Sequence, residues 1–189
     1  MTSELSRSLG VSLAEEACAD LLVAIGEDVE REGLIDTPKR VSKMYFELTS
    51  GLRDPAPKIT CFSKGKNDQL IAILDIDFWS LCEHHLVPFY GRVHIGYLPD
   101  KKLVGLSKFG RIVDWFAKRP QIQEEMTANI ADFIVENISP IGVIVVVEAS
   151  HLCAIMRGVQ KPNQLMVTSA LRGTLPKDEF FKMLEMRKS

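Results

Sequence analysis

Two short clusters in the second half of the chain carry side chains that bind metal ions. The first is Cys82-Glu83-His84-His85 and the second is His151-Leu152-Cys153. Thiolate and imidazole are the ligands that zinc prefers, and a catalytic zinc site uses three protein ligands and leaves the fourth position for water. A structural site would more often show paired Cys-x-x-Cys knuckles, which the chain lacks. The clusters therefore predict one shared, catalytic metal site.

The spacing within each cluster suits a shared ion. Cys82 and His85 face the same way if their segment turns as a helix does. His151 and Cys153 share a face if their segment is a strand. Either cluster alone is weak evidence, because Cys-x-x-His is common by chance and a lone histidine is usually structural. With His84, five candidate ligands compete for three positions, so the residues alone leave the ligand set open.

A second group of residues is basic. Ser107 is expected to cap a helix, and Lys108 and Arg111 share a face of its first turn. The start of a helix attracts phosphate through free backbone N–H groups and the helix dipole. Further candidates for the same anion are Arg157, Arg40 and Lys43. The alternative is a solvated helix face, and spacing does not separate the two interpretations.

Gln123 and Glu124 follow Pro120 near the start of the next expected helix. A carboxylate at a helix N-terminus is usually only a favourable charge. The functional alternative is a planar acceptor for a base with adjacent N–H donors, such as guanine.

Composition excludes several classes of protein. The chain has 189 residues, 46% hydrophobic and 25% charged, as expected of a globular protein. Its formal net charge of -2 argues against a general affinity for nucleic acid. Residues 1–10 lack the apolar core of a signal peptide, and the longest apolar stretch, 141–147, is too short to span a bilayer. Cys18 and Cys61 suggest no disulfide framework, so we expect a reduced, cytoplasmic protein without a membrane partner.

Hydrophobic periodicity predicts the elements that position these residues. Helices are expected over residues 11–30, from a Thr37 N-cap to near Gly51, and after Ser107, Pro120 and Pro176. Strands are expected over residues 70–78, 89–98, 141–149 and 165–171. This order predicts an α+β fold: a four-stranded antiparallel sheet with helices on one face in residues 58–189, preceded by an N-terminal helical segment in residues 1–57. Such a sheet has two open edges that other subunits could cover.

Several motifs together form a longer pattern. They are Cys82-Glu83-His84-His85-Leu86-Val87-Pro88-Phe89, Gly105-Leu106-Ser107-Lys108, Arg111-Ile112-Val113-Asp114, Arg119-Pro120-Gln121-Ile122-Gln123-Glu124, and His151-Leu152-Cys153 with Met156-Arg157-Gly158-Val159. These motifs closely resemble GTP cyclohydrolase I, as do Glu32-Gly33-Leu34, Thr37-Pro38 and Arg40-Val41. The resemblance covers roughly residues 15–175, in order.

The resemblance implies a zinc-dependent enzyme. In this family zinc is held by the residues matching Cys82, His85 and Cys153. Water activated by the metal attacks carbon 8 of the guanine ring of GTP, formate leaves, and the product is 7,8-dihydroneopterin triphosphate, the first step of pterin and folate-type biosynthesis. His84 and His151 match the family's two non-ligand histidines, the expected acid–base groups. Which of them acts at which step is left open.

The same resemblance assigns the substrate contacts and the assembly. Glu124 with Gln123 would bind the guanine edge. The triphosphate site would be lined by Ser107, Lys108, Arg111, Arg157, Arg40 and Lys43. The family has the tunnelling fold, in which the sheets of several subunits join edge to edge into a barrel. Two barrels stack into a homodecamer whose active sites lie between subunits.

One departure and two rival classes remain. The family often has Ser and Thr where this chain has Gln164 and Met166, which puts the local packing or the pocket rim in doubt. Another tunnelling-fold enzyme, a pterin synthase or a deazaguanine reductase, is disfavoured because it would use other ligands or a nucleophilic cysteine. A non-catalytic zinc-stabilised binding protein is disfavoured because a structural site needs no spare histidines such as His84 and His151. The sequence leaves the downstream pathway and any regulatory partner open.

Overall fold

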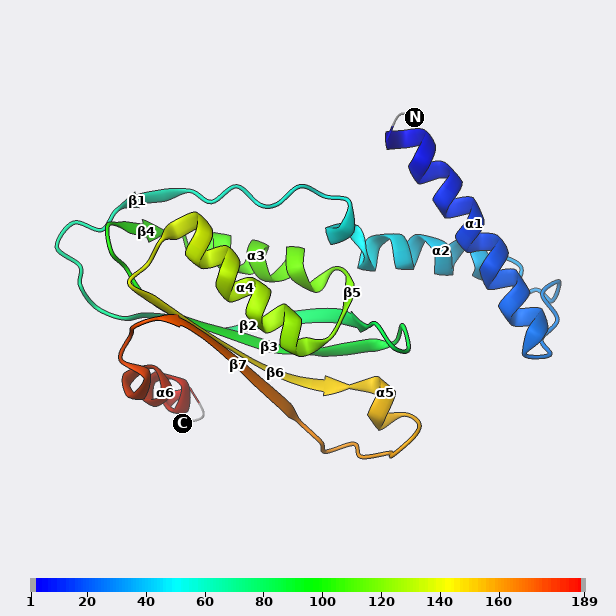
Figure 1. Cartoon of the computed structure of the whole chain (residues 1–189). Coiled ribbons are helices and arrows are strands. Elements are labelled where there is room, and N and C mark those ends of the chain that lie inside the picture. The colour runs from blue at the N-terminus through cyan, green and yellow to red at the C-terminus, as the bar shows by residue number, and fades with distance from the viewer. Residues whose placement is uncertain (1–2, 188–189) are drawn as a thin grey trace. The chain divides into compact units, whose positions relative to one another are not determined.

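The computed structural model describes residues 3–187 and shows an α+β chain (Figure 1). Met1 and Thr2, part of the stretch read for a signal peptide, lie outside the described residues. The chain divides into two compact units between Ser50 and Gly51. Among the described residues, no helix has both the length and the apolar character that crossing a membrane requires.

The N-terminal unit contains two helices, α1 (Ser3–Ala24) and α2 (Thr37–Leu48). The Ser42 hydroxyl on α2 donates to the carbonyl of Val11 on α1 at 2.8 Å. The expected Thr37 cap is wrong: the residue before the helix is Asp36, and no side chain caps the helix. Proline in the first turn favours the start of α2, because its ring fixes the helical φ angle.

The second unit holds the remaining elements. A short 3₁₀ turn, η1 (Ser50–Leu52), lies at the boundary. The strands are β1 (Cys61–Ser63), β2 (Ile71–Cys82), β3 (Pro88–Leu98), β4 (Lys102–Val104), β5 (Pro120–Gln121), β6 (Gly142–His151) and β7 (Met166–Gly173). The helices are α3 (Ser107–Ala117), α4 (Gln123–Ile138), α5 (Leu152–Ile155) and α6 (Lys177–Met186).

The main sheet has five strands in the order β5-β2-β3-β6-β7. The four expected strands correspond to β2, β3, β6 and β7, which pair in antiparallel fashion. The fifth, β5, is a two-residue strand that runs parallel to the end of β2 and pairs Gln121 with Cys82. A two-residue strand has no periodicity, which is why the sequence pattern did not predict it. A second small sheet pairs β1 with β4.

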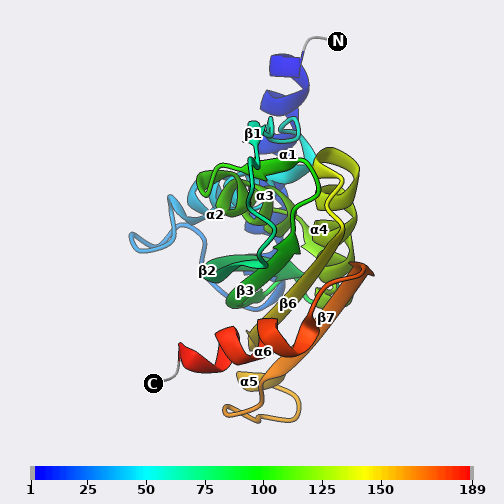
Figure 2. The same ribbon diagram turned by 90° about the vertical axis from the view of Figure 1, so that its left-hand side faces the viewer.

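Helices cover both faces of the main sheet, not one as expected. Along β6, Val145 and its odd-numbered neighbours pack into the core beneath α3 and α4. The alternate residues Ile144 and Val146 pack against Phe180 and Leu184 of α6. Figure 2 shows α6 on the side of the sheet opposite α3 and α4. Because successive strand residues point to opposite faces, the unbroken apolar run of β6 reports burial on both sides.

The predicted apolar stripe of α3 is fully buried. Phe109, Ile112 and Val113 are at most 1% exposed. The expected Ser107 cap is wrong, since the residue before the helix is Leu106 and no side chain caps it. The stripe therefore fixes which face of α3 is turned to the sheet. In the first turn of α3, the N–H groups of Lys108 and Phe109 donate to the backbone carbonyls of Gly105 and Leu106, at 2.9 Å and 3.2 Å.

Candidate active site

The two metal-binding clusters meet at one end of the main sheet. One ligand atom from each of Cys82, His85 and Cys153 lies within 4.8 Å of the other two. Cys82 is buried, Cys153 is half-buried and His85 is exposed, so the group opens to solvent on one side. Two sulfurs and one imidazole nitrogen form a donor set that could bind a metal ion and leave a fourth position open.

A tight turn after β2 places His85 over Cys82. The backbone N–H of Leu86 donates to the carbonyl of Cys82 at 2.8 Å, and Cys82 N–H donates to the carbonyl of Val87 at 2.9 Å. Leu86 adopts a left-handed conformation with φ 53°. As a result the Cys82 sulfur lies 3.8 Å from Nδ1 of His85. The helix-like spacing predicted for these two residues corresponds to a turn.

The second cluster, His151-Leu152-Cys153, does not lie entirely in a strand, although its spacing suggested one. β6 ends at His151, and Cys153 lies in the one-turn helix α5. This turn still directs the Cys153 thiol at Cys82, and the alternative of a shared face along a strand is wrong. Burial raises the pKa of the Cys153 thiol, and the neighbouring Cys82 thiol raises it further. A bound cation would offset both effects, because it stabilises thiolates.

The two remaining histidines of the clusters differ in their surroundings. His84 has a largely exposed side chain, with Nδ1 3.9 Å from the Cys82 sulfur. His151 stacks flat on Phe89, with ring centroids 4.7 Å apart and an interplanar angle of 2°. Burial lowers the pKa of His151, and the charge of Glu124 opposes that shift. His151 is therefore a neutral, oriented imidazole beside the metal-binding group.

The side chain of Gln123 is buried, at 1% exposure, where a contact with a ligand was predicted. Its Oε1 lies 2.9 Å from Nε2 of His151. Sequence reasoning missed this contact, and also the stacking of Phe89 on His151. Glu124 is exposed in the first turn of α4 and keeps its carboxylate accessible.

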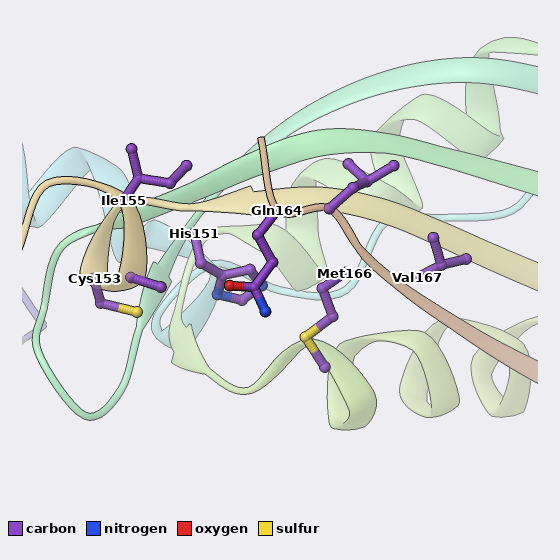
Figure 3. A pocket seen from close by; sticks show the side chains of 8 residues that line it. His151, Cys153, Ile155, Gln164, Met166 and Val167 are labelled. Carbon is purple, nitrogen blue, oxygen red and sulfur yellow. The ribbon is translucent and has the colours of Figure 1, made fainter. Parts of the chain in front are cut away.

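A pocket of about 480 Å³ opens beside His151. Figure 3 shows Cys153 and His151 toward one side of it and Met166 and Val167 toward the other. Gln164 also lines the pocket. The two positions at which the chain departs from the family pattern, Gln164 and Met166, are therefore part of the pocket wall.

The predicted phosphate-binding residues are only partly brought together. Arg157 lies beside the metal-binding group, with Nη1 3.2 Å from Nε2 of His85 and also donating to the carbonyl of Cys153. Ser107, Lys108 and Arg111 begin α3 at the far end of the sheet (Figure 1). Val104, which shortly precedes α3, donates its N–H to the hydroxyl of Tyr97. Tyr97 lies near the end of β3 that is opposite to Phe89.

Arg40 and Lys43 belong to the N-terminal unit. Arg40 forms an exposed ion pair with Asp36 one turn earlier, at 3.1 Å. Exposed pairs of this kind contribute little to stability, so the guanidinium remains available to another anion. Their role at a phosphate site stays a prediction.

The fold and the site define an α+β protein with a Cys–His–Cys group at the end of its sheet that could bind a metal ion. Residues 14–188 match the family model described as GTP cyclohydrolase I. A GTP cyclohydrolase 1 of Bacillus pumilus (strain SAFR-032) is 54% identical over 168 residues, covering 88% of this chain and 89% of the relative. That of Bacillus subtilis (strain 168) is 53% identical over 166 residues, 87% of each chain. The chain belongs to the GTP cyclohydrolase I family, a family of enzymes.

A crystal structure of the archaeosine synthase QueF-Like in the apo form is more distant. It aligns with a TM-score of 0.49 and 18% identity, covering 59% of this chain and 100% of that one. A likeness at this level carries no argument about fold or function.

Proposed function

We propose that the protein is a zinc-dependent enzyme that converts GTP and water into 7,8-dihydroneopterin triphosphate and formate. The observation that carries this proposal is the Cys82–His85–Cys153 group in a chain that matches the GTP cyclohydrolase I family over residues 14–188. The reaction opens pterin and folate-type biosynthesis, and we place the enzyme in the cytoplasm.

Cys82, His85 and Cys153 would hold the zinc. Their sulfur and imidazole donors fit that ion, and the convergence of one ligand atom from each residue within 4.8 Å of the others supports a cation between them. Zinc bound there would act as a Lewis acid that activates water near neutral pH.

His151 and His84 would move the protons of the reaction. The lowered pKa of His151 leaves its ring neutral near pH 7, and a neutral ring can accept a proton from a reacting group. His84, whose side chain is largely exposed, can exchange protons with solvent.

Glu124 would recognise the guanine base by hydrogen bonding to its edge. Its exposed carboxylate can accept from the ring N–H and the exocyclic amine together, in a charge-assisted bidentate contact. Gln123 was predicted to bind guanine beside it. That contact would require the Gln123 amide to leave its buried partners.

The triphosphate would be bound by residues from more than one subunit. Ser107, Lys108 and Arg111 begin α3 at the end of the sheet remote from Cys82, so a second copy is needed to complete the site. The other proposed phosphate contacts are Arg157, Arg40 and Lys43. The tunnelling fold of a homodecamer would supply this arrangement, with residues 58–189 as the catalytic domain and residues 1–57 as a helical segment. The open outer edge of β7 supports it.

The test is to incubate the purified protein with GTP and to follow formate release and pterin fluorescence together. Both signals should appear in equal amounts, should disappear after the metal is removed by a chelator, and should return with added zinc. Sedimentation of the same sample should show an assembly. A monomer with full activity would contradict the shared site, and formate without a pterin would contradict the proposed product.

A further inference from the structure

The buried amide of Gln123 has only one consistent orientation. Its Nε2 lies 3.0 Å from the carbonyl oxygen of Val147, 3.2 Å from that of Met166 and 3.0 Å from the hydroxyl of Thr168. Carbonyl oxygens only accept hydrogen bonds, so the end of the amide that faces them must be the NH₂ group. Oε1 is therefore the atom that faces His151, at 2.9 Å.

This orientation determines which nitrogen of His151 carries the proton. An amide oxygen only accepts, so Nε2 of His151 must be the donor of this bond. A neutral imidazole has one donor and one acceptor nitrogen, and the acceptor lone pair is then on Nδ1. The flat stack on Phe89 fixes the plane of the ring, so both its tautomer and its direction are set.

We propose that Gln123 is a positioning residue that holds His151 as its Nε2–H tautomer and thereby leaves Nδ1 as the acceptor nitrogen of the ring for a hydrogen bond from the substrate. The inference rests on the proposed function for its catalytic consequence. Gln123 thus acts through His151 and needs no contact with guanine.

The kinetic test compares two buried glutamines. Gln123→Met removes the amide that holds His151. Gln121→Met is the matched control, because Gln121 is also buried, at 4% exposure, and its Nε2 bonds Ser80 and the Phe116 carbonyl, not a histidine. Gln123→Met should lower kcat about 10- to 100-fold, the usual range for loss of an orienting partner, with little change in KM. Gln121→Met should leave kcat near that of wild type, and both variants should retain zinc.

A double-mutant cycle separates positioning from direct contact with the substrate. If Gln123 acts through His151, Gln123→Met should cause no further loss in a His151→Ala background. Equal losses in both backgrounds would overturn the proposal. A raised KM with unchanged kcat would also overturn it and would make Gln123 a guanine contact.

The tautomer can be measured without any turnover. The chain has 4 histidines, so the protein labelled with ¹⁵N-histidine gives few signals in solid-state NMR, and His151→Ala identifies the signal of His151. Wild type should show a protonated Nε2 and an unprotonated Nδ1, and Gln123→Met should show a mixture. A wild-type ring protonated at Nδ1 would overturn the proposal, even if Gln123→Met failed to fold. Absence of GTP turnover in wild type would contradict the proposed function and leave the tautomer to be decided by NMR.

Discussion

Two histidines of the main sheet, His151 and His94, differ in the hydrogen bonding of their ring nitrogens: His151 belongs to the candidate site and His94 to the structural core. His94, on β3, is fully buried on the face covered by α6. Asp75 N–H donates to its Nδ1 at 3.0 Å, and Arg187 lies 3.1 Å from its Nε2. Arg187 in turn pairs with Asp75 and with Glu148. Both ring nitrogens of His94 therefore face neighbours from the chain itself.

His151 is engaged on one side only. Gln123 contacts Nε2, and Nδ1 has no hydrogen-bond partner among residues 8–187, whose side chains the structure describes. Its ring lines the pocket. The comparison shows that the polar atoms of a buried network are hydrogen-bonded to one another. In a binding site, by contrast, one atom of an otherwise fixed side chain remains available to a ligand.

The largest effect is expected from the metal-binding group. Cys153→Ser should abolish both zinc retention and turnover, because too few ligands remain to hold the ion firmly. Zinc per subunit after dialysis and formate release are the measurements. Cys18→Ser, in α1 and outside the metal-binding group, is the control and should change neither. Stoichiometric zinc with normal formate release in Cys153→Ser would exclude this ligand assignment.

His151→Ala should retain zinc and lose about 10²- to 10⁴-fold in turnover, the range for a general acid–base group. His94→Asn is the comparison variant from the other face of the sheet. It should lower stability but leave the site chemistry intact, as followed by thermal unfolding and pterin fluorescence. If dialysis depleted zinc from His151→Ala, His151 would be a ligand.

Glu124→Ala tests base recognition. Inosine triphosphate lacks the exocyclic amine and so loses one hydrogen bond to the Glu124 carboxylate. Wild type should therefore prefer GTP by about 10- to 150-fold in kcat/KM, the effect expected from losing one hydrogen bond to a charged group. Glu124→Ala should lose most of that preference. Glu125→Ala, the adjacent exposed carboxylate in the first turn of α4, should retain it. Full preference in Glu124→Ala would mean that Glu124 does not contact the amine.

The smallest effect concerns pH and His94. Burial, followed by the charge of Arg187, lowers the pKa of His94 below its usual 6.5, while Glu148 and Asp75 oppose the shift. The unfolded chain therefore binds more protons below pH 6.5, and stability should fall as pH drops from 6.5 toward the folded pKa. Thermal unfolding across this window should be flatter for His94→Asn than for wild type. Parallel pH profiles for the two proteins would contradict this assignment.

Sequence patterns predicted the elements better than the contacts between them. Alternation located β3 and helical periodicity located α3, because burial of one face leaves a repeat in the sequence. The unbroken β-branched run located β6, which is buried on both faces. No repeat of this kind in the sequence indicated that α6 covers the second face of the sheet.

At the site, residue types identified five candidate ligands, and the family resemblance selected the three that converge. Three residues are too few to tell a strand from the turn of α5. A buried glutamine beside an exposed glutamate gave no local signal that Gln123 contacts His151. Its partners on β6 and β7 are distant in the sequence.

Leu86 gives the metal-binding turn a further property. A leucine in the left-handed region costs roughly 1–2 kcal/mol, and two backbone hydrogen bonds between Cys82, Leu86 and Val87 hold it there. The turn is therefore preorganised: its conformational entropy is lost when the chain folds and not when the metal arrives. Glycine at this position would relieve the strain and widen the range of loop conformations. Metal binding would then have to order His85, and the affinity would fall even though every ligand atom remained.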